Sequence, residues 1–408
     1  MYILPGFIKI ITNENAVRIS SQVKQNTLLL TDDKYIKEFQ EIQKLGGCEV
    51  LNTTLKTTLH NQEMLLTEKE LIRLLNEVKS LLDKTMMITI MPTEACNFRC
   101  PYCYESHEPR LMSKQTMSII EKYIAERIEN FETLEINWFG GEPTLCIDTI
   151  ADFSNFIYSL QQKYKFKYIS NITTNGYLLN QENFIRCYNS GIRTYQITID
   201  GFNHDKTRPL ANGGKSLETI IQNIKAIHCL DNKTYNFKVI IRHNILSNDN
   251  DLSWYDYLSH ILGNDMRFGV VVRAVTDWGG DKVKTLKLLK DEKERNLQIH
   301  KEYIERIGLS MDEGDNQLFG RICYAAYPNG YIFRADGSIM KCSVALNDEI
   351  NRVGKIIDNK VKINNTVNDL WCRNSYDYKC YRCKNVLSCL NLSCRYNSIK
   401  NKELTCLE

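Results

Sequence analysis

The sequence predicts an α/β protein built on a parallel sheet, curled or open, and two observations support that prediction. Strand-like runs alternate with amphipathic stretches six times after about residue 86. The strand-like runs are residues 87–91, 134–139, 168–174, 194–200, 237–243 and 267–274. Such an alternation calls for right-handed crossovers between parallel strands. Short motifs with Gly, Asn, Asp or Cys follow four of the runs, at the strand ends where chemistry collects in such sheets.

The composition is that of a folded protein and excludes several function classes. Of 408 residues, 43% are hydrophobic and 25% are charged, which excludes a disordered or fibrous chain. The net charge is only +3, without the basic excess typical of nucleic-acid binding. No apolar run approaches the ~18 residues needed to span a membrane, and residues 1–7 lack the features of a signal peptide. We therefore expect a cytoplasmic protein with neither a nucleic-acid nor a membrane partner.

The chain is predicted to have three domains, residues 1–85, 86–310 and 311–408. In the first domain, short apolar runs predict strands, and a helix follows with a capping box at Thr67 and Glu70. A small α+β domain fits this pattern. The second domain contains the six alternations. The third is rich in cysteine and has little regular periodicity, as expected where metal sites replace a hydrophobic core.

The cysteines carry the strongest functional signal, because most of the 15 fall into two groups. In a reducing cytosol, grouped cysteines indicate metal binding or catalysis rather than disulfides. The first group is Cys96, Cys100 and Cys103, just after the first strand of the predicted sheet. Three thiolates at this spacing can hold three irons of a cubane cluster and leave the fourth open, whereas a zinc site would need a fourth ligand such as His107. The cysteines outside the groups, expected to be buried and unreactive, are Cys48, Cys146, Cys187 and Cys229.

The C-x3-C-x2-C spacing, with an aromatic residue directly before the last cysteine, resembles the signature of the radical S-adenosylmethionine (SAM) enzymes. The Gly-Gly-Glu-Pro sequence at 140–143 resembles a second motif of that family. The resemblance implies a partial (β/α)6 TIM-like barrel and a [4Fe-4S] cluster that binds SAM. The implied SAM contacts are Tyr102, Gly141, Glu142, Asn175, Thr198 and Arg208. Glu142 would bind the amino group and Arg208 the carboxylate, whereas a capped turn explains Asn175 equally well.

The second cysteine group resembles the SPASM extension of radical SAM enzymes that modify peptides. That extension carries two auxiliary [4Fe-4S] clusters, which would bring the total to three. The resemblance assigns one auxiliary cluster to Cys380, Cys383, Cys389 and Cys406. It assigns the other to Cys323, Cys342 and Cys394. Four residues, instead of the usual three, separate Cys389 from Cys394. Cys372 is an additional candidate ligand. A zinc ribbon is the alternative to an iron-sulfur cluster for the C-x2-C pair.

The resemblance also implies an activity. Radical SAM enzymes reductively cleave SAM, and the 5'-deoxyadenosyl radical abstracts a hydrogen atom from an unactivated carbon. Most SPASM enzymes act on peptides, and the N-terminal domain is compatible with a winged-helix-like element that binds the leader of a precursor peptide by strand addition. The sequence does not single out a catalytic base. The expected partners are a leader-bearing precursor peptide and a low-potential electron donor of the flavodoxin or ferredoxin type.

Among the possible peptide modifications, we expect thioether formation of the sactipeptide or ranthipeptide type. Joining a cysteine sulfur to carbon removes two hydrogens, and an auxiliary cluster can accept the second electron. A carbon–carbon crosslinking or epimerising maturase is the next alternative. An anaerobic sulfatase-maturating enzyme follows, because Ser343 replaces the base Asp that would come after Cys342. A non-enzymatic zinc or iron-sulfur protein ranks last, since it would leave Glu142 and Arg208 without a role.

Overall fold

The computed structural model describes residues 1–13, 15–21, 26–247, 251–280, 282–289, 293–312 and 322–402, which fall into two compact units. Unit 1 comprises the described residues of Met1–Asp83, Gly314–Pro328 and Asp369–Glu408. Unit 2 comprises those of Lys84–Glu313 and Asn329–Asn368. This division differs from the three predicted domains, because the predicted C-terminal domain is shared between the units. No helix in these described ranges is both long and apolar enough to cross a membrane.

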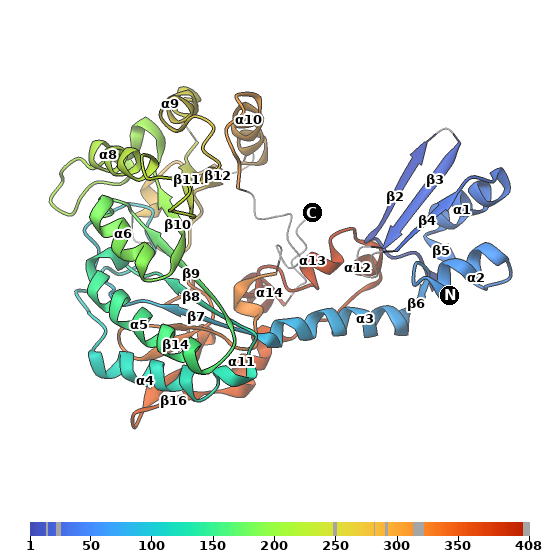
Figure 1. Cartoon of the computed structure of the whole chain (residues 1–408), viewed down its shortest axis with the longest axis horizontal. Helices are drawn as coiled ribbons and strands as arrows, with labels where there is room; N and C mark the ends of the chain where they lie inside the picture. Colours follow the sequence, from blue (N-terminus) through green and yellow to red (C-terminus); the bar gives the residue numbers. More distant parts are fainter. Residues whose placement is uncertain are drawn as a thin grey trace. The chain divides into compact units, whose positions relative to one another are not determined.

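Unit 2 is built on a ten-stranded sheet in which six consecutive strands run parallel (Figure 1). These are β7 (Thr85–Ile90), β8 (Thr133–Trp138), β9 (Lys167–Thr174), β10 (Ile192–Thr198), β11 (Lys238–Ile245) and β12 (Phe268–Ala274). They pair side by side in sequence order, and each overlaps one of the six strand-like runs of the sequence. The predicted α/β fold with a large parallel sheet is confirmed.

Four strands from the predicted C-terminal domain extend this sheet. They are β13 (Gly330–Phe333), β14 (Ser338–Met340), β15 (Arg352–Ile357) and β16 (Lys360–Ile363). β13 pairs in parallel with β7, and the other three follow as antiparallel neighbours. The turn between β13 and β14 contains Asp336 and Gly337, and the φ of +78° at Gly337 favours glycine. An Asp-Gly pair between two strands is a local signal for a hairpin, and the hairpin is present. Residues 329–368 belong to the sheet because β13 pairs with β7.

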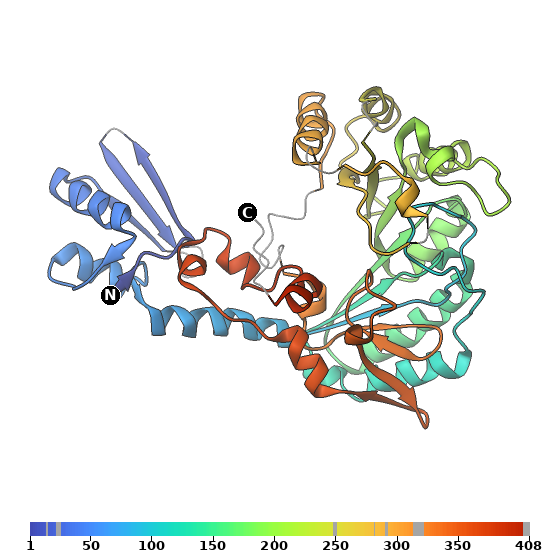
Figure 2. The same ribbon diagram turned by 180° about the vertical axis from the view of Figure 1, so that it is seen from behind.

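Helices cover one face of the parallel strands (Figure 2). They are α4 (Lys114–Ala125), α5 (Ile147–Lys163), α6 (Gln181–Asn189), α8 (Leu217–His228), α9 (Ser253–Leu262) and α10 (Lys293–Arg306). Strand side chains alternate between this face and the opposite one. In β8, Leu134 and Trp138 are buried, and Trp138 packs edge-on against Phe153 of α5. Glu135 and Asn137 point to the opposite face, which we call the inner face.

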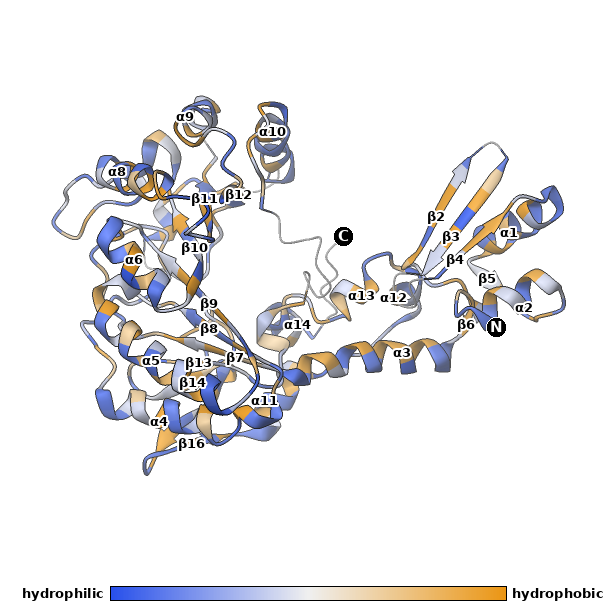
Figure 3. Ribbon diagram, viewed as in Figure 1, coloured by the Kyte–Doolittle hydropathy of each residue, from blue (hydrophilic) through white to orange (hydrophobic). Residues whose placement is uncertain are grey.

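Unit 1 contains two small sheets and three helices from the N-terminal part of the chain. One sheet is β1 (Tyr2–Ile3), β5 (Gly47–Cys48) and β6 (Leu66–Thr67); the other is β2 (Ile8–Asn13), β3 (Ala16–Ser21) and β4 (Thr27–Leu30). The helices are α1 (Asp33–Leu45), α2 (Thr54–Asn61) and α3 (Glu68–Ser80). α3 begins at the predicted capping box, in which Glu70 Oε2 accepts the Thr67 backbone N–H at 2.8 Å. In Figure 3, hydrophobic and hydrophilic residues alternate along α3, as expected for a helix with one buried face.

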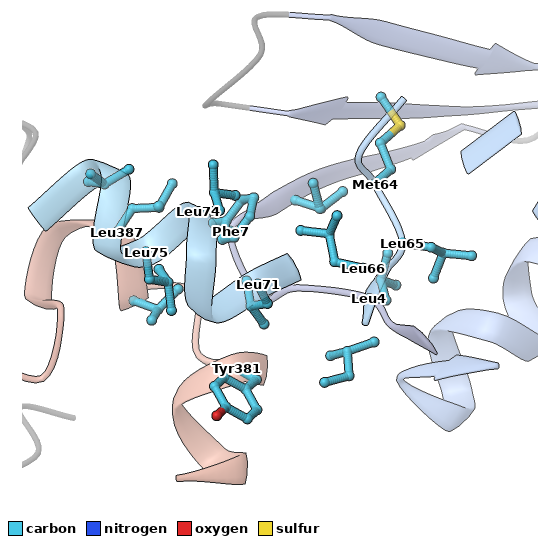
Figure 4. Packing of buried hydrophobic residues seen from close by; sticks show 14 of the residues in the cluster. Leu4, Phe7, Met64, Leu65, Leu66, Leu71, Leu74, Leu75, Tyr381 and Leu387 are labelled. Carbon is cyan, nitrogen blue, oxygen red and sulfur yellow. The ribbon is translucent and has the colours of Figure 1, made fainter. Parts of the chain in front are cut away.

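The buried face of α3 explains why the first and last parts of the chain form one unit. Leu71, Leu74 and Leu75 pack in one apolar cluster with Tyr381 and Leu387 of the C-terminal segment (Figure 4). The helices of that segment are α11 (Asn365–Cys372), α12 (Tyr378–Arg382), α13 (Val386–Cys389) and α14 (Arg395–Asn401). The cysteine-rich end of the chain thus contributes to the hydrophobic core of the predicted N-terminal domain.

Candidate active site

The first cysteine group lies on the loop after β7, beside the carboxyl ends of the neighbouring strands. Backbone hydrogen bonds attach the loop there. Glu142 N, after β8, donates to Ala95 O at 2.9 Å, and Arg99 N donates to Pro209 O, beyond β10, at 2.9 Å. The structure therefore brings together the motifs that the sequence placed at four different strand ends.

The three thiols of this loop are poorly placed to ionise on their own. Burial, with a contribution from the Glu142 carboxylate, raises the pKa of Cys96 to about 12. Burial and the Glu105 carboxylate raise the pKa of Cys103 to about 12, and burial also raises the pKa of Cys100. Across the described residues, no three His, Cys, Asp or Glu side chains surround a single metal-ion position. Thiolates in such a setting need a bound cation, and the donor set of three adjacent thiols fits a metal cluster.

The two glycines after β8 pack directly on the cysteine loop. A Cβ on Gly141 would lie only 2.2 Å from the carbonyl oxygen of Ala95, and Gly140 has a φ of +108°. A side chain at either position would therefore displace the loop. The resemblance implies a SAM contact at Gly141, and the structure shows that the space left by its missing side chain is taken by the backbone of Ala95.

Glu142 is buried, and its carboxylate joins the ends of β8 and β9. Oε1 accepts from Thr144 N at 3.0 Å, from Thr144 Oγ1 at 2.6 Å and from Thr174 Oγ1 at 2.6 Å. Oε2 accepts from Asn175 N at 2.7 Å. Because each carboxylate oxygen has two lone pairs, Oε2 has room for one further donor. The side chain fixes two strand ends and leaves one acceptor position for a ligand.

Tyr102 lies between Arg208 and Asp200 in a buried chain of hydrogen bonds. Arg208 Nη1 donates to Tyr102 Oη at 2.9 Å, and Tyr102 Oη donates to Asp200 Oδ2 at 2.6 Å. Asn244 Nδ2, from β11, donates to the same tyrosine oxygen at 3.3 Å. Arg208 Nε and Asp200 Oδ1 are buried without a hydrogen-bond partner among the described residues. Since such atoms are costly to bury unpaired, they indicate a ligand that offers one acceptor and one donor.

Asn175 and Thr198 lie at the ends of β9 and β10. The Asn175 side chain donates to Asn97 Oδ1 at 2.7 Å and accepts from Tyr177 N at 3.0 Å. It therefore caps its turn and holds the cysteine loop, as in the alternative to a SAM contact. Thr198 is buried and pairs in register with Arg242 of β11.

All six predicted SAM-contact residues lie at one end of the unit 2 sheet. The structure adds Asp200, Arg242 and Asn244, to which the sequence analysis gave no role. Asp200 is the last residue of the strand-like run 194–200, and its position just after β10 was the available signal. For Arg242 and Asn244 the signal was the polar stretch Arg-His-Asn near the carboxyl end of a largely apolar strand.

A cavity of about 1150 Å³ lies at the other end of the sheet, at the amino-terminal ends of β10, β11 and β12. Arg193, Lys238 and Arg267 are among its lining residues. None of the motif residues lines it. Cavity volume alone would therefore place the site at the wrong end of the strands, away from the cysteine loop.

The second cysteine group is divided between the two units. Cys342 follows β14 in unit 2, and Cys406 lies outside the described residues. Those in unit 1 are Cys323, Cys380, Cys383, Cys389 and Cys394. Within unit 1, the Cys380 and Cys389 thiols interact electrostatically, and Cys383 Sγ accepts the Asn385 backbone N–H at 3.4 Å. Amide hydrogen bonds to sulfur are among the features that tune cysteine ligands of iron-sulfur clusters.

A second set of cysteines in unit 1 lies around Arg395. Its guanidinium interacts electrostatically with the thiols of Cys323, Cys372 and Cys394. The Cys323 thiol also accepts the backbone N–H of Arg395. The additional candidate, Cys372, therefore lies near two members of its suggested ligand set.

The four cysteines outside the groups differ in exposure. Cys187 is buried, as expected, whereas Cys48 and Cys146 are partly exposed. Cys229 is exposed at the C-terminal end of α8, so the expectation of a buried thiol is wrong there.

Residues 90–258 match the Radical SAM superfamily. Two curated relatives, each named GTP 3',8-cyclase, align with a similar part of the chain. The protein of Haemophilus ducreyi is 30% identical over 135 residues, which cover 32% of this chain and 37% of the relative. The protein of Campylobacter jejuni subsp. doylei is 33% identical over 136 residues, which cover 31% of this chain and 39% of the relative. The chain thus spans less than two-fifths of the length of these relatives.

Two solved structures resemble the chain over most of their length. The structure of anSMEcpe with bound AdoMet and Cp18Cys peptide has a TM-score of 0.58 at 17% identity and covers 78% of this chain and 92% of its own. The structure of Streptococcus suis SuiB bound to precursor peptide SuiA has a TM-score of 0.52 at 15% identity and covers 99% of this chain and 98% of its own. At such identities the likeness shows the fold alone. The family match at residues 90–258 is to a radical SAM domain, and the parallel sheet of unit 2 agrees with it.

Proposed function

We propose that this protein is a radical SAM peptide maturase that forms thioether crosslinks in a ribosomally made precursor peptide. The observation that carries the proposal is a loop of three half-buried thiols beside two unpaired charged atoms, Arg208 Nε and Asp200 Oδ1. The thiols suit three irons of a [4Fe-4S] cluster. The unpaired atoms suit a ligand with a carboxylate and with hydroxyl or ammonium donors, and SAM is such a ligand.

In this proposal, each residue of the site binds a different part of the cluster or of SAM. The cluster ligands are Cys96, Cys100 and Cys103. Arg208, held by Tyr102, binds the SAM carboxylate, and the free acceptor position of Glu142 receives its amino group. When bound, the cluster and SAM supply a carbon-centred radical that removes a hydrogen atom from an unactivated carbon. The chain itself has to hold that carbon within reach and exclude water.

The two similar solved structures support a peptide substrate. Both anSMEcpe and SuiB were solved with peptides bound, and the likeness to SuiB extends over nearly the whole chain. In unit 1, β2 and β4 are the outer strands of their sheet, and within the described residues neither has a partner on its outer side. Exposed Ile11 on β2 and Leu29 on β4 add apolar contact surface. We therefore assign leader binding to this sheet, by addition of a strand to one of its edges.

Thioether formation requires an electron acceptor as well as a radical. One hydrogen atom leaves the carbon, one proton leaves the cysteine thiol, and one further electron has to be removed as the carbon–sulfur bond forms. We assign that electron to auxiliary clusters on the second cysteine group, and from there to an external acceptor. The first electron would come from a flavodoxin or ferredoxin. The proximity of Cys380 to Cys389, and of Cys323 to Cys394, supports the assignment of two separate ligand sets.

The test is the mass of a short cysteine-containing peptide encoded beside the gene and co-expressed with the enzyme without oxygen. Loss of two hydrogens per site, with those cysteines resistant to alkylation, is the expected result. The same loss with cysteines that still react would move the bond to carbon. An unchanged mass, together with no 5'-deoxyadenosine from purified enzyme and dithionite, would contradict the proposal.

A further inference from the structure

Two arginines project from the inner face of the sheet close to the candidate SAM site. Arg242 lies on β11 and Arg273 on the neighbouring strand β12, where Arg273 pairs in register with Asn244. Arg242 and Arg273 are therefore diagonal neighbours on the same face, a separation of about 7–8 Å that long side chains bridge easily. Burial lowers the pKa of Arg242, and the nearby Arg273 cation acts in the same direction. The two guanidinium groups thus share one small region.

Neither arginine forms an ion pair with a described residue, although the Asp200 carboxylate, which is hydrogen-bonded to Tyr102, acts on Arg242 electrostatically. Arg242 Nε donates to Asn244 Oδ1 at 2.8 Å, and Arg273 Nη1 donates to the Val272 carbonyl at 3.3 Å. In the part of the chain that the structure describes, no carboxylate lies within 4.0 Å of either group. Arg242 is partly buried, so its unused N–H groups are partly shielded from water. Two adjacent cations without an ion-pair partner form a region that favours an anion.

The sheet itself does not supply that anion. Among the six parallel strands, Glu135 is the one acidic residue, and it lies on β8. Its Oε1 accepts from Asn137 Nδ2 at 3.1 Å and from Asn171 Nδ2 at 3.2 Å. The inner face therefore pairs its acid with amides on β8 and β9, and leaves its arginines open on β11 and β12.

We propose that Arg242 and Arg273 bind a carboxylate of the peptide substrate, so that the segment to be modified carries an acidic side chain near the reacting residue. This inference rests on the proposed function, because it presumes a peptide on the inner face. Guanidinium groups bind carboxylates through two parallel hydrogen bonds, which fixes orientation as well as position. Arg242 also interacts electrostatically with Tyr102 and Tyr104, so the bound carboxylate would lie beside the cysteine loop.

The position of Arg273 favours a polymer over a small cofactor as the source of the carboxylate. β12 is an outer strand of the sheet, bridged at Val270 to Met311, and Arg273, beyond that bridge, is exposed. An exposed position at the end of the sheet suits a peptide, which has to enter and leave the site. SAM already has a candidate partner in Arg208, whose unpaired Nε is buried beside the cysteine loop.

Arginine labelling tests the inference without any radical chemistry. The reconstituted holoenzyme is treated anaerobically with phenylglyoxal, and modified arginines are counted by peptide mapping. The probes are acetyl-Gly-Asp-Gly-amide, its Asn counterpart and SAM, with exposed Arg306 of α10 as the internal control. We expect the Asp peptide to slow labelling of Arg242 and Arg273 several-fold, and the Asn peptide to leave it unchanged. Equal protection by both peptides, protection by SAM alone, or protection of Arg306 to the same extent would overturn the inference.

A variant sharpens the test. In the parent protein, the Asp peptide should protect Arg242 from labelling better than the Asn peptide does. Arg273→Gln should remove most of this difference, because one of the two cations is gone. Arg273→Lys should retain part of it. If Arg273→Gln keeps the full preference, the paired site does not exist. The labelling experiment needs no turnover. A failure of SAM cleavage would therefore count against the proposed function without changing the outcome of the labelling experiment.

Discussion

The two cysteine groups are held in different ways, and the difference predicts how each responds to loss of metal. The first group follows a strand inside a ten-stranded sheet, and backbone hydrogen bonds attach its loop to the segments after β8 and β10. Most cysteines of the second group lie on or beside α12, α13 and α14, which have five, four and seven residues. Helices this short do not persist alone in water. The first site is therefore formed by the fold, whereas the second depends on metal and on packing against α3.

Replacing Cys96, Cys100 and Cys103 with Ala should have the largest effect on chemistry and little effect on the fold. We expect 5'-deoxyadenosine formation to fall below detection, because no thiolate remains to hold the cluster. The far-UV circular dichroism and urea midpoint should stay close to those of the parent, since the sheet positions the loop. Cys229→Ala, at an exposed position, is the matched control. Retained SAM cleavage in the triple variant would refute the cluster assignment.

Replacing Cys380 and Cys383 with Ala should separate the two regions. We expect the crosslink to be lost and SAM cleavage to continue, because the first site does not depend on these residues. The C-terminal segment should also become more sensitive to limited proteolysis, since its short helices lose a metal ligand set. Mass analysis of the peptide and of the proteolytic fragments measures both effects. Full crosslinking by this variant would show that the second group has no part in the reaction.

The first loop should also make the metal-free protein less stable at high pH. Burial raises the pKa values of Cys96 and Cys103 to about 12, above the ~8.5 of an unfolded thiol. The folded state then binds more protons than the unfolded state above about pH 8.5, so stability falls as pH rises through this window. Between pH 8 and pH 10 the loss should be on the order of 1–2 kcal/mol per thiol. Urea midpoints of the metal-free protein measure it, and a Cys96→Ala, Cys103→Ala variant with an equally steep decline would contradict this cause.

Local sequence signals predicted the strands and the motifs at their ends, but not which strands distant in sequence pair with each other. Alternating runs located all six parallel strands, and the Asp336-Gly337 pair located a hairpin. No local pattern shows that β13 pairs with β7, because their residues are more than 240 positions apart in sequence. The same limit applies to unit 1, where the apolar face of α3 was visible in the sequence but its partners near residue 381 were not.

The roles of the site residues were also predictable only in part from the sequence. The motif residues could be named from spacing, because the chemistry of three thiols or of a strand-end glycine follows from local sequence. The hydrogen bonds of Glu142 with Thr144, Thr174 and Asn175, which leave one acceptor position on Oε2, depend on which strand ends meet. So does the unpaired Nε of Arg208. These features arise from tertiary packing and therefore appear only in the folded chain.

Tyr381→Phe should give the smallest effect and tests how the second region is anchored. Tyr381 Oη donates to Glu68 Oε1 at 3.1 Å, while its ring packs with α3 residues in the apolar cluster. The substitution removes the hydrogen bond and keeps the ring, so we expect a loss of about 0.5–1.5 kcal/mol. Because the chain has two units, local hydrogen exchange in α12 is a better measure than a global midpoint. Tyr378→Phe, at an exposed position of the same helix, is the control. A cost confined to α12 with metal bound would show that packing on α3 supports this segment alongside its clusters, whereas no cost in either metal-bound or metal-free protein would mean that the ring alone anchors it.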